Sequence, residues 1–188
     1  MRAFRIIGVC VLFCLLIAPA RAGDAMADGG WASYGGDAGG QRYVAADRIS
    51  PENVSKLAPA WTFRTGALDG KTDKVLGRTA FEATPILVAG SLVFCTPYNE
   101  VIAIDPATGD EKWRFDPHLP LTLRPANQYV CRGVAYWKDS SAPAGQGCSE
   151  RIFVATNHSR LIALDAHNGQ VCNGFGSRIT PGMVDAGP

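Results

Sequence analysis

Cysteine is the residue type in this sequence with the plainest chemistry. Four cysteines follow the N-terminal segment 1–22, namely Cys95, Cys131, Cys148 and Cys172; that segment is described below as a secretory signal. An even number of them in an exported chain favours disulfide bonds. No Cys-x-x-Cys pair occurs, which argues against a metal site built from these thiols. The cysteines therefore predict covalent cross-links, and the sequence leaves their pairing open.

Two charged residues are further candidates for chemistry. Arg132 follows Cys131 directly, and a planar guanidinium pairs with a carboxylate through two parallel hydrogen bonds. Glu82 lies at the start of an apolar run. Each also has an ordinary interpretation, Glu82 as an exposed strand residue and Arg132 as a surface charge beside a disulfide. The three histidines, His118, His158 and His167, lie in turn-like contexts, and we interpret them as solvated loop residues.

The first 22 residues are organised as a secretory signal peptide. Arg2 and Arg5 precede an uncharged apolar run of 13 residues, Ile6 to Ala18, and Ala20-Arg21-Ala22 is a small-x-small cleavage site. A transmembrane anchor is the alternative, but a span needs about 20 apolar residues. Removing residues 1–22 takes away three arginines and no acids, so the formal charge falls from +1 to −2. A nearly neutral chain without a basic stripe argues against a nucleic-acid partner.

Short strands must position these side chains. Apolar, β-branched runs recur after residue 80, each bounded by Gly, Pro, Asn or Asp, which is the pattern of strands joined by turns. One helical turn is expected within Arg48–Leu57, because proline is favoured at a first helical position. The expected strands are Phe81–Val88, Ser91–Thr96, Val101–Ile104 and Glu111–Phe115, then Val130–Tyr136, Arg151–Thr156, Arg160–Leu164 and Val171–Phe175, with Lys138–Gly147 as a surface insertion.

The two sets of strands are related by a repeat. Val101-Ile102-Ala103-Ile104-Asp105 matches Leu161-Ile162-Ala163-Leu164-Asp165 at an offset of 60, and Gly109 and Gly169 follow the two aspartates by four residues. Aspartate accepts backbone hydrogen bonds in such turns, and glycine supplies their positive φ. A repeated unit of four strands is typical of a propeller blade. The expected fold class is all-β, an incomplete β-propeller of about two blades. A β-sandwich is the alternative, which the repetition disfavours.

We expect three segments: a signal peptide at 1–22, a lead-in at 23–66, and two truncated propeller blades at 67–188. In the lead-in, Ala60-Trp61-Thr62-Phe63-Arg64 is similar to Lys112-Trp113-Arg114-Phe115, the last strand of the first blade. No three strands precede it. We therefore interpret it as a ring-closing strand with partners outside this sequence.

The stretch from Ala103 to Trp113 resembles the tryptophan-docking motif of the quinoprotein dehydrogenases, Ala-x-Asp-x-x-Thr-Gly-x-x-x-Trp. Those enzymes hold pyrroloquinoline quinone (PQQ) in an eight-bladed propeller. Trp113 would pack between blades, with Gly109 in the preceding turn. Glu82-Ala83-Thr84-Pro85-Ile86, Cys95-Thr96-Pro97-Tyr98-Asn99 and Cys131-Arg132-Gly133 are most similar to the glucose, quinate and shikimate branch. The alternatives are an alcohol dehydrogenase branch, which usually has adjacent cysteines, and a non-enzymatic envelope scaffold.

The resemblance implies a periplasmic parent enzyme, with membrane association as an option. Such an enzyme oxidises a sugar or cyclitol hydroxyl with PQQ and passes electrons to ubiquinone or a cytochrome, and a calcium or magnesium ion bridges the quinone to the protein. Glu82 resembles the acid that hydrogen-bonds the cofactor, and Arg132 the arginine that faces its oxygens. Gln128 departs from a histidine that relatives often carry. The catalytic aspartate and the metal ligands belong to later blades, so this fragment alone is expected to be inactive.

The cysteines fit a structural role in this scheme. Cys148 and Cys172 flank two strands of one blade, and Cys95 and Cys131 lie on corresponding parts of successive repeats. Each pair is a candidate bridge, and the other pairings stay open.

Overall fold

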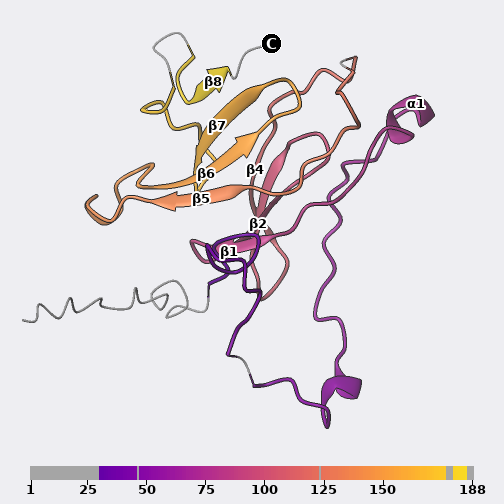
Figure 1. Cartoon of the computed structure of the whole chain (residues 1–188), viewed down its shortest axis with the longest axis vertical. Helices are drawn as coiled ribbons and strands as arrows, with labels where there is room; N and C mark the ends of the chain where they lie inside the picture. Colours follow the sequence, from indigo (N-terminus) through magenta and orange to yellow (C-terminus); the bar gives the residue numbers. More distant parts are fainter. Residues whose placement is uncertain (1–29, 46, 123, 177–179, 186–188) are drawn as a thin grey trace, which may run out of the picture.

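The computed structural model describes residues 30–45, 47–122, 124–176 and 180–185. Within them, short strands form two antiparallel four-stranded sheets that lie side by side (Figure 1). The first sheet contains β1 (Ile86–Val88), β2 (Ser91–Cys95), β3 (Val101–Ile104) and β4 (Glu111–Phe115); the second contains β5 (Ala135–Lys138), β6 (Glu150–Ala155), β7 (Arg160–Asp165) and β8 (Met183–Asp185). The strands of each sheet are in sequence order, so the expectation of an all-β chain built from four-stranded units is confirmed.

The last strand of the second sheet is not the expected one. Val171 makes only an isolated bridge to Leu164, and the fourth strand is β8. The predicted strand Val171–Phe175 is wrong because the chain turns after Cys172: the N–H of Phe175 donates to the Cys172 carbonyl at 2.9 Å, and the N–H of Ala163 in β7 donates to Gly182 instead. Cys172 is cross-linked to Cys148, and the ring of Phe175 packs edge-on against Phe153 at 5.2 Å between centroids.

Two strands begin later than expected, and the helices are very short. β1 starts at Ile86 and β5 at Ala135, because the residues before them pair with each other, as described below. A 3-10 turn, η1 (Val54–Lys56), lies within the predicted helical turn, and α1 (Asp73–Leu76) was not expected. Four residues are too few to give a helical period.

The main core lies between the two sheets. Val93 and Ala103 of the first sheet and Ile152, Val154 and Leu164 of the second are all fully buried in one cluster. Because side chains alternate along a strand, Ile102 and Ile104 point to the other face of the first sheet, where they pack with Phe94. Both faces of β3 are therefore covered.

The lead-in covers that second face. Trp61 and Phe63 pack against Phe94, Ile102 and Ile104, and the chain before them runs out as a long extended loop (Figure 1). Residues 60–64 have no strand partner within the described part of the chain, so a ring-closing strand with partners outside this sequence stays a prediction. The predicted signal peptide at 1–22 lies outside the described residues. Among those residues, no helix has the length and apolar character needed to cross a membrane.

Candidate functional site

The segments that lead into the two sheets run next to each other. Tyr129 donates its backbone N–H to the carbonyl of Arg78 at 2.7 Å and accepts one from Ala80 at 2.9 Å, which makes a parallel bridge beside Thr79. Further along, the N–H of Thr84 donates to the carbonyl of Arg132 at 3.1 Å. We call residues 78–84 and 129–132 the approach segments. They bring together two parts of the chain that are about 50 residues apart.

Glu82 and Arg132, the two predicted cofactor-binding residues, meet across the approach segments. Nη2 of Arg132 lies 3.2 Å from Oε2 of Glu82. The side chain of Arg132 is 75% exposed and that of Glu82 is 42% exposed, so both remain accessible to a ligand. An exposed ion pair of this kind contributes at most about 1 kcal/mol to stability. A contribution of that size does not by itself account for placing these two charges together.

The chemistry of this pair suits an acidic, multiply oxygenated ligand. A guanidinium presents several N–H donors in a plane and binds carboxylates or quinone oxygens, while a neighbouring carboxylate accepts a ligand N–H. PQQ offers both kinds of partner. The two residues present therefore fit that cofactor in type.

A disulfide lies directly beside the pair. Cys95, the last residue of β2, is bonded to Cys131, with the two Cα atoms 6.0 Å apart. The second disulfide joins Cys148 to Cys172, with Cα atoms 5.8 Å apart. Each bridge joins one of the pairs that the sequence offered as a candidate.

Tryptophan docking joins the successive units. The indole N–H of Trp113 donates to the carbonyl of Ala166 at 3.2 Å, and its ring covers Gly169. Trp61 repeats this contact one unit earlier, donating to Pro106 at 3.2 Å and covering Gly109. The turn that receives each indole is itself repeated, because Gly109 donates to the carbonyl of Asp105 and Gly169 to that of Asp165, each at 2.9 Å. Trp61 thus occupies the place of a preceding sheet's tryptophan.

Comparison with known proteins identifies the family. Residues 31–187 match the family described as PQQ: Glucose/ethanol/alcohol dehydrogenase, beta-propeller domain. The chain belongs to this family. The two stacked sheets are therefore part of a quinoprotein β-propeller, and the Glu82–Arg132 pair lies in a chain of the PQQ family.

Individual quinoproteins are similar over most of the chain. It is 39% identical over 168 residues to quinoprotein glucose dehydrogenase A of Acinetobacter calcoaceticus, covering 84% of this chain and 21% of that protein. The quinate/shikimate dehydrogenase (quinone) of Acinetobacter baylyi is 36% identical over 162 residues, with coverages of 78% and 19%. A solved structure, the quinohemoprotein alcohol dehydrogenase from Comamonas testosteroni, superposes with a TM-score of 0.58 at 30% identity, with coverages of 79% and 19%. The chain spans about a fifth of the length of these relatives.

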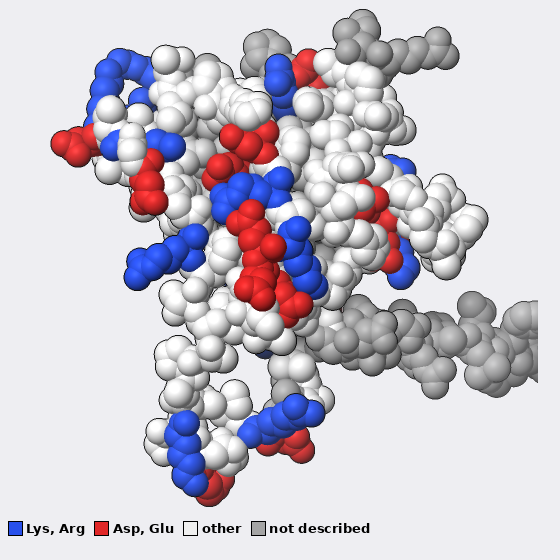
Figure 2. Space-filling model, turned by 180° about the vertical axis from the view of Figure 1, so that it is seen from behind, with Lys and Arg blue, Asp and Glu red and all other residues white. Residues whose placement is uncertain are grey.

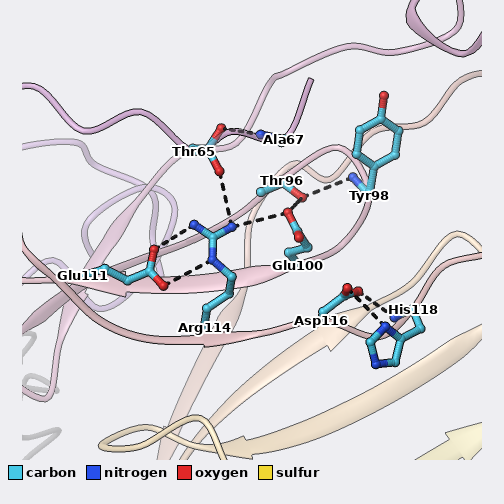
Figure 3. Close-up of polar contacts among 9 residues, drawn as sticks. All are labelled: Thr65, Ala67, Thr96, Tyr98, Glu100, Glu111, Arg114, Asp116 and His118. Carbon is cyan, nitrogen blue, oxygen red and sulfur yellow. Dashed lines mark hydrogen bonds and ion pairs between the residues drawn. The ribbon is translucent and has the colours of Figure 1, made fainter. Parts of the chain in front are cut away.

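The quinoprotein sheets also carry a polar hollow that the sequence did not suggest. Arg114 of β4 makes two hydrogen bonds to the carboxylate of Glu111 and lies 3.5 Å from Glu100 (Figure 3). It also donates to the carbonyl of Thr65, which belongs to the lead-in. Carboxylate partners raise the pKa of Arg114. The hollow, of about 480 Å³, is lined by groups from segments far apart in the sequence, so no local pattern could have revealed it.

A second polar cluster surrounds Glu150. The Tyr136 hydroxyl donates to it at 2.7 Å, Nζ of Lys138 lies 3.0 Å away, and Nε2 of His167 lies 3.8 Å away. Burial raises the pKa of Glu150, but the Tyr136 hydrogen bond and the Lys138 ammonium outweigh it and leave the pKa lowered. Burial, and then the hydrogen bond to Glu150, raise the pKa of Tyr136. The sequence pattern alone assigned none of these residues a role.

The histidines differ from one another. His118 is 88% exposed beside Asp116, as expected of a solvated loop residue. His158 departs from that interpretation, because its Nδ1 is buried without a hydrogen-bond partner, and burial lowers its pKa.

In the described part of the chain, no three His, Cys, Asp or Glu side chains are grouped to hold a metal ion. Basic and acidic side chains are intermixed over the face seen in Figure 2.

Proposed function

We propose that the complete gene product is a PQQ-dependent dehydrogenase in which this chain supplies the first two blades of the propeller. Glu82 and Arg132, which precede β1 and β5, bind the quinone. The observation that carries the proposal is the meeting of these two side chains at 3.2 Å in a chain of the PQQ family. When bound, PQQ supplies the two-electron oxidation; Arg132 orients it through its oxygens and Glu82 through a hydrogen-bond donor.

The proposed substrate is a sugar, polyol or cyclitol hydroxyl. Supporting this, the relatives include glucose and quinate/shikimate dehydrogenases and the glycerol dehydrogenase large subunit of Gluconobacter oxydans, which is 40% identical over 153 residues, covering 80% of this chain and 20% of that protein. We propose ubiquinone or a cytochrome as the acceptor and calcium or magnesium as the metal, with metal ligands beyond this chain. The apolar run and cleavage site near residue 22 support a periplasmic location, with membrane association as an option.

The test measures cofactor binding and turnover separately. The complete gene product is loaded with PQQ and Ca²⁺, and PQQ affinity is measured by titration. Dye reduction is then followed with glucose, glycerol and quinate. Arg132→Ala and Glu82→Gln are each expected to weaken PQQ binding about tenfold or more, since hydrogen bonds to charged groups are worth about 1.5–3 kcal/mol. Arg124→Ala, an exposed arginine eight residues earlier, is the control and should bind PQQ like the wild type.

Failure to bind PQQ at all would reject the enzyme and leave a propeller scaffold as the explanation. Binding that survives both substitutions would retain the cofactor but remove Glu82 and Arg132 from its site.

A further inference from the structure

The Cys95–Cys131 disulfide is adjacent in sequence to Arg132. A cross-link that only stabilises the fold does not need to lie next to this residue. Cys131 immediately precedes Arg132. Its partner Cys95 is the last residue of β2, which lies between β1 and β3 in the first sheet. Cys95 is fully buried and Cys131 is 6% exposed. The backbone of Arg132 is therefore tied covalently to the core of a sheet to which it does not belong.

Other contacts hold Arg132 only weakly. Its side chain is 75% exposed, so packing does not fix it, and among the described residues its one charged partner is Glu82. Its carbonyl accepts a backbone hydrogen bond from Thr84 at 3.1 Å. The regular ladder of the second sheet begins only at Ala135. A segment with isolated backbone hydrogen bonds at the surface is expected to open easily.

We infer that the Cys95–Cys131 disulfide is a positioning element for Arg132, holding its approach segment in register beside Glu82. The ligand part of this inference rests on the proposed function, because the anion that Arg132 meets is PQQ. The positional part rests on the contacts of the two approach segments alone.

The second disulfide provides a matched control. Cys148 and Cys172 are 24 residues apart, against 36 for the first pair. They link the end of the insertion to the segment after β7, so this bridge stays within the second unit. Removing either bridge releases a chain constraint of similar size, but only the first touches an approach segment.

Hydrogen exchange tests the positional part without cofactor. The Thr84, Ala80 and Tyr129 amides report on the approach segments, and that of Asp105 reports on a docking turn away from both bridges. In Cys95→Ala/Cys131→Ala, the first three amides should exchange about tenfold faster or more, relative to Asp105. Cys148→Ala/Cys172→Ala should leave that ratio unchanged. An unchanged ratio in the first variant would overturn the inference whether or not the protein binds PQQ.

A double-mutant cycle on PQQ affinity in the complete gene product tests the route through Arg132. If the bridge acts by placing this residue, removing the bridge should weaken binding about tenfold, and adding Arg132→Ala should weaken it little further. The Cys148–Cys172 variant should bind within about twofold of wild type. Additive losses, or equal losses from both bridges, would show a general stability effect and overturn the inference.

A glycine inserted between Cys131 and Arg132 covers the case in which the bridge-less variant does not fold. It keeps the bridge but moves the arginine, so it too should weaken PQQ binding; unaltered affinity contradicts the inference. If the wild-type protein does not bind PQQ, the proposed function fails. The hydrogen-exchange ratios then decide by themselves whether the disulfide positions the approach segment.

Discussion

Trp113 of β4 lies so close over Gly169 of the next sheet that a Cβ there would come within 2.5 Å of its Cε3 atom. Trp61 stands in the same relation to Gly109, where the corresponding distance to Cδ2 is 2.6 Å. Each glycine has a positive φ, +79° at Gly109 and +72° at Gly169. The glycine of the motif thus serves its turn and also makes room for the tryptophan of the unit before it.

Replacing Gly169 by alanine should separate these two roles. Gly145→Ala is the matched control, since Gly145 has a φ of +77° and nothing within 4 Å of a built Cβ. Both substitutions strain the backbone, but only Gly169→Ala displaces an indole. We expect it to cost about 1–3 kcal/mol more than the control, the range for overpacking. Urea unfolding of both variants gives the difference, and equal costs would show that the turn alone requires glycine.

Removing the Trp113 ring should loosen the contact between the sheets. Trp113 is 8% exposed, whereas Trp137 of β5 is 43% exposed and stacks with Arg151 at 4.9 Å. Trp113→Ala should cost about 3–5 kcal/mol, as for large buried aromatics. Trp137→Ala, measured in the same urea titration, should cost clearly less. A smaller loss at Trp113 than at Trp137 would contradict the docking role.

Asn99 joins the two sheets through a polar contact. It is 1% exposed with a φ of +64°, and its Oδ1 accepts the backbone N–H of Asn157 at 2.8 Å. Asn99→Gly keeps the backbone conformation but leaves that N–H without an acceptor, at a cost of about 1–3 kcal/mol. Ser159→Gly, 60 residues later with a φ of +61° and an exposed side chain, should change the unfolding free energy by less than about 0.5 kcal/mol. Similar values for the two variants would remove Asn99 from the contact.

Glu150 should make stability depend on acidity. Its pKa in the folded chain lies below the ordinary value of 4.5, so its contribution is present above the unfolded-state pKa. That contribution is lost as the pH falls through the folded-state pKa. Glu150→Gln should therefore be less stable than wild type at pH 6, and the gap should narrow as the pH approaches 3. Thermal unfolding across this range checks it against Asp47→Asn, an exposed carboxylate of the lead-in. A gap that does not change with pH would contradict the assignment.

The repeated strands could be predicted because their information is local. Val101 to Asp105 and Leu161 to Asp165 each combine an apolar run with a turn aspartate and glycine. Val171–Phe175 starts with an apolar residue and follows such a turn, yet it bends after Cys172, where the N–H of Phe175 donates to the Cys172 carbonyl, and β8 takes the edge position. A fourth strand cannot be chosen from composition when the choice depends on residues some distance away.

The site shows the same division. Glu82 and Arg132 were selected through a family resemblance, and nothing in their own spacing places them 3.2 Å apart. The partners of Arg114 come from three segments and those of Glu150 from two, namely β5 and the turn after β7, so a single sequence does not show that they meet. Side chains that act through non-local contacts leave little trace in a single sequence.

The docking of Trp113 also has a consequence for biosynthesis. Its acceptor, the carbonyl of Ala166, lies 53 residues nearer the C-terminus. A chain that leaves the ribosome or an export channel N-terminus first must deliver these 53 residues after Trp113 before the acceptor is present. Until then the indole lies uncovered beside a first sheet whose four strands are all present, and a chaperone can bind this intermediate.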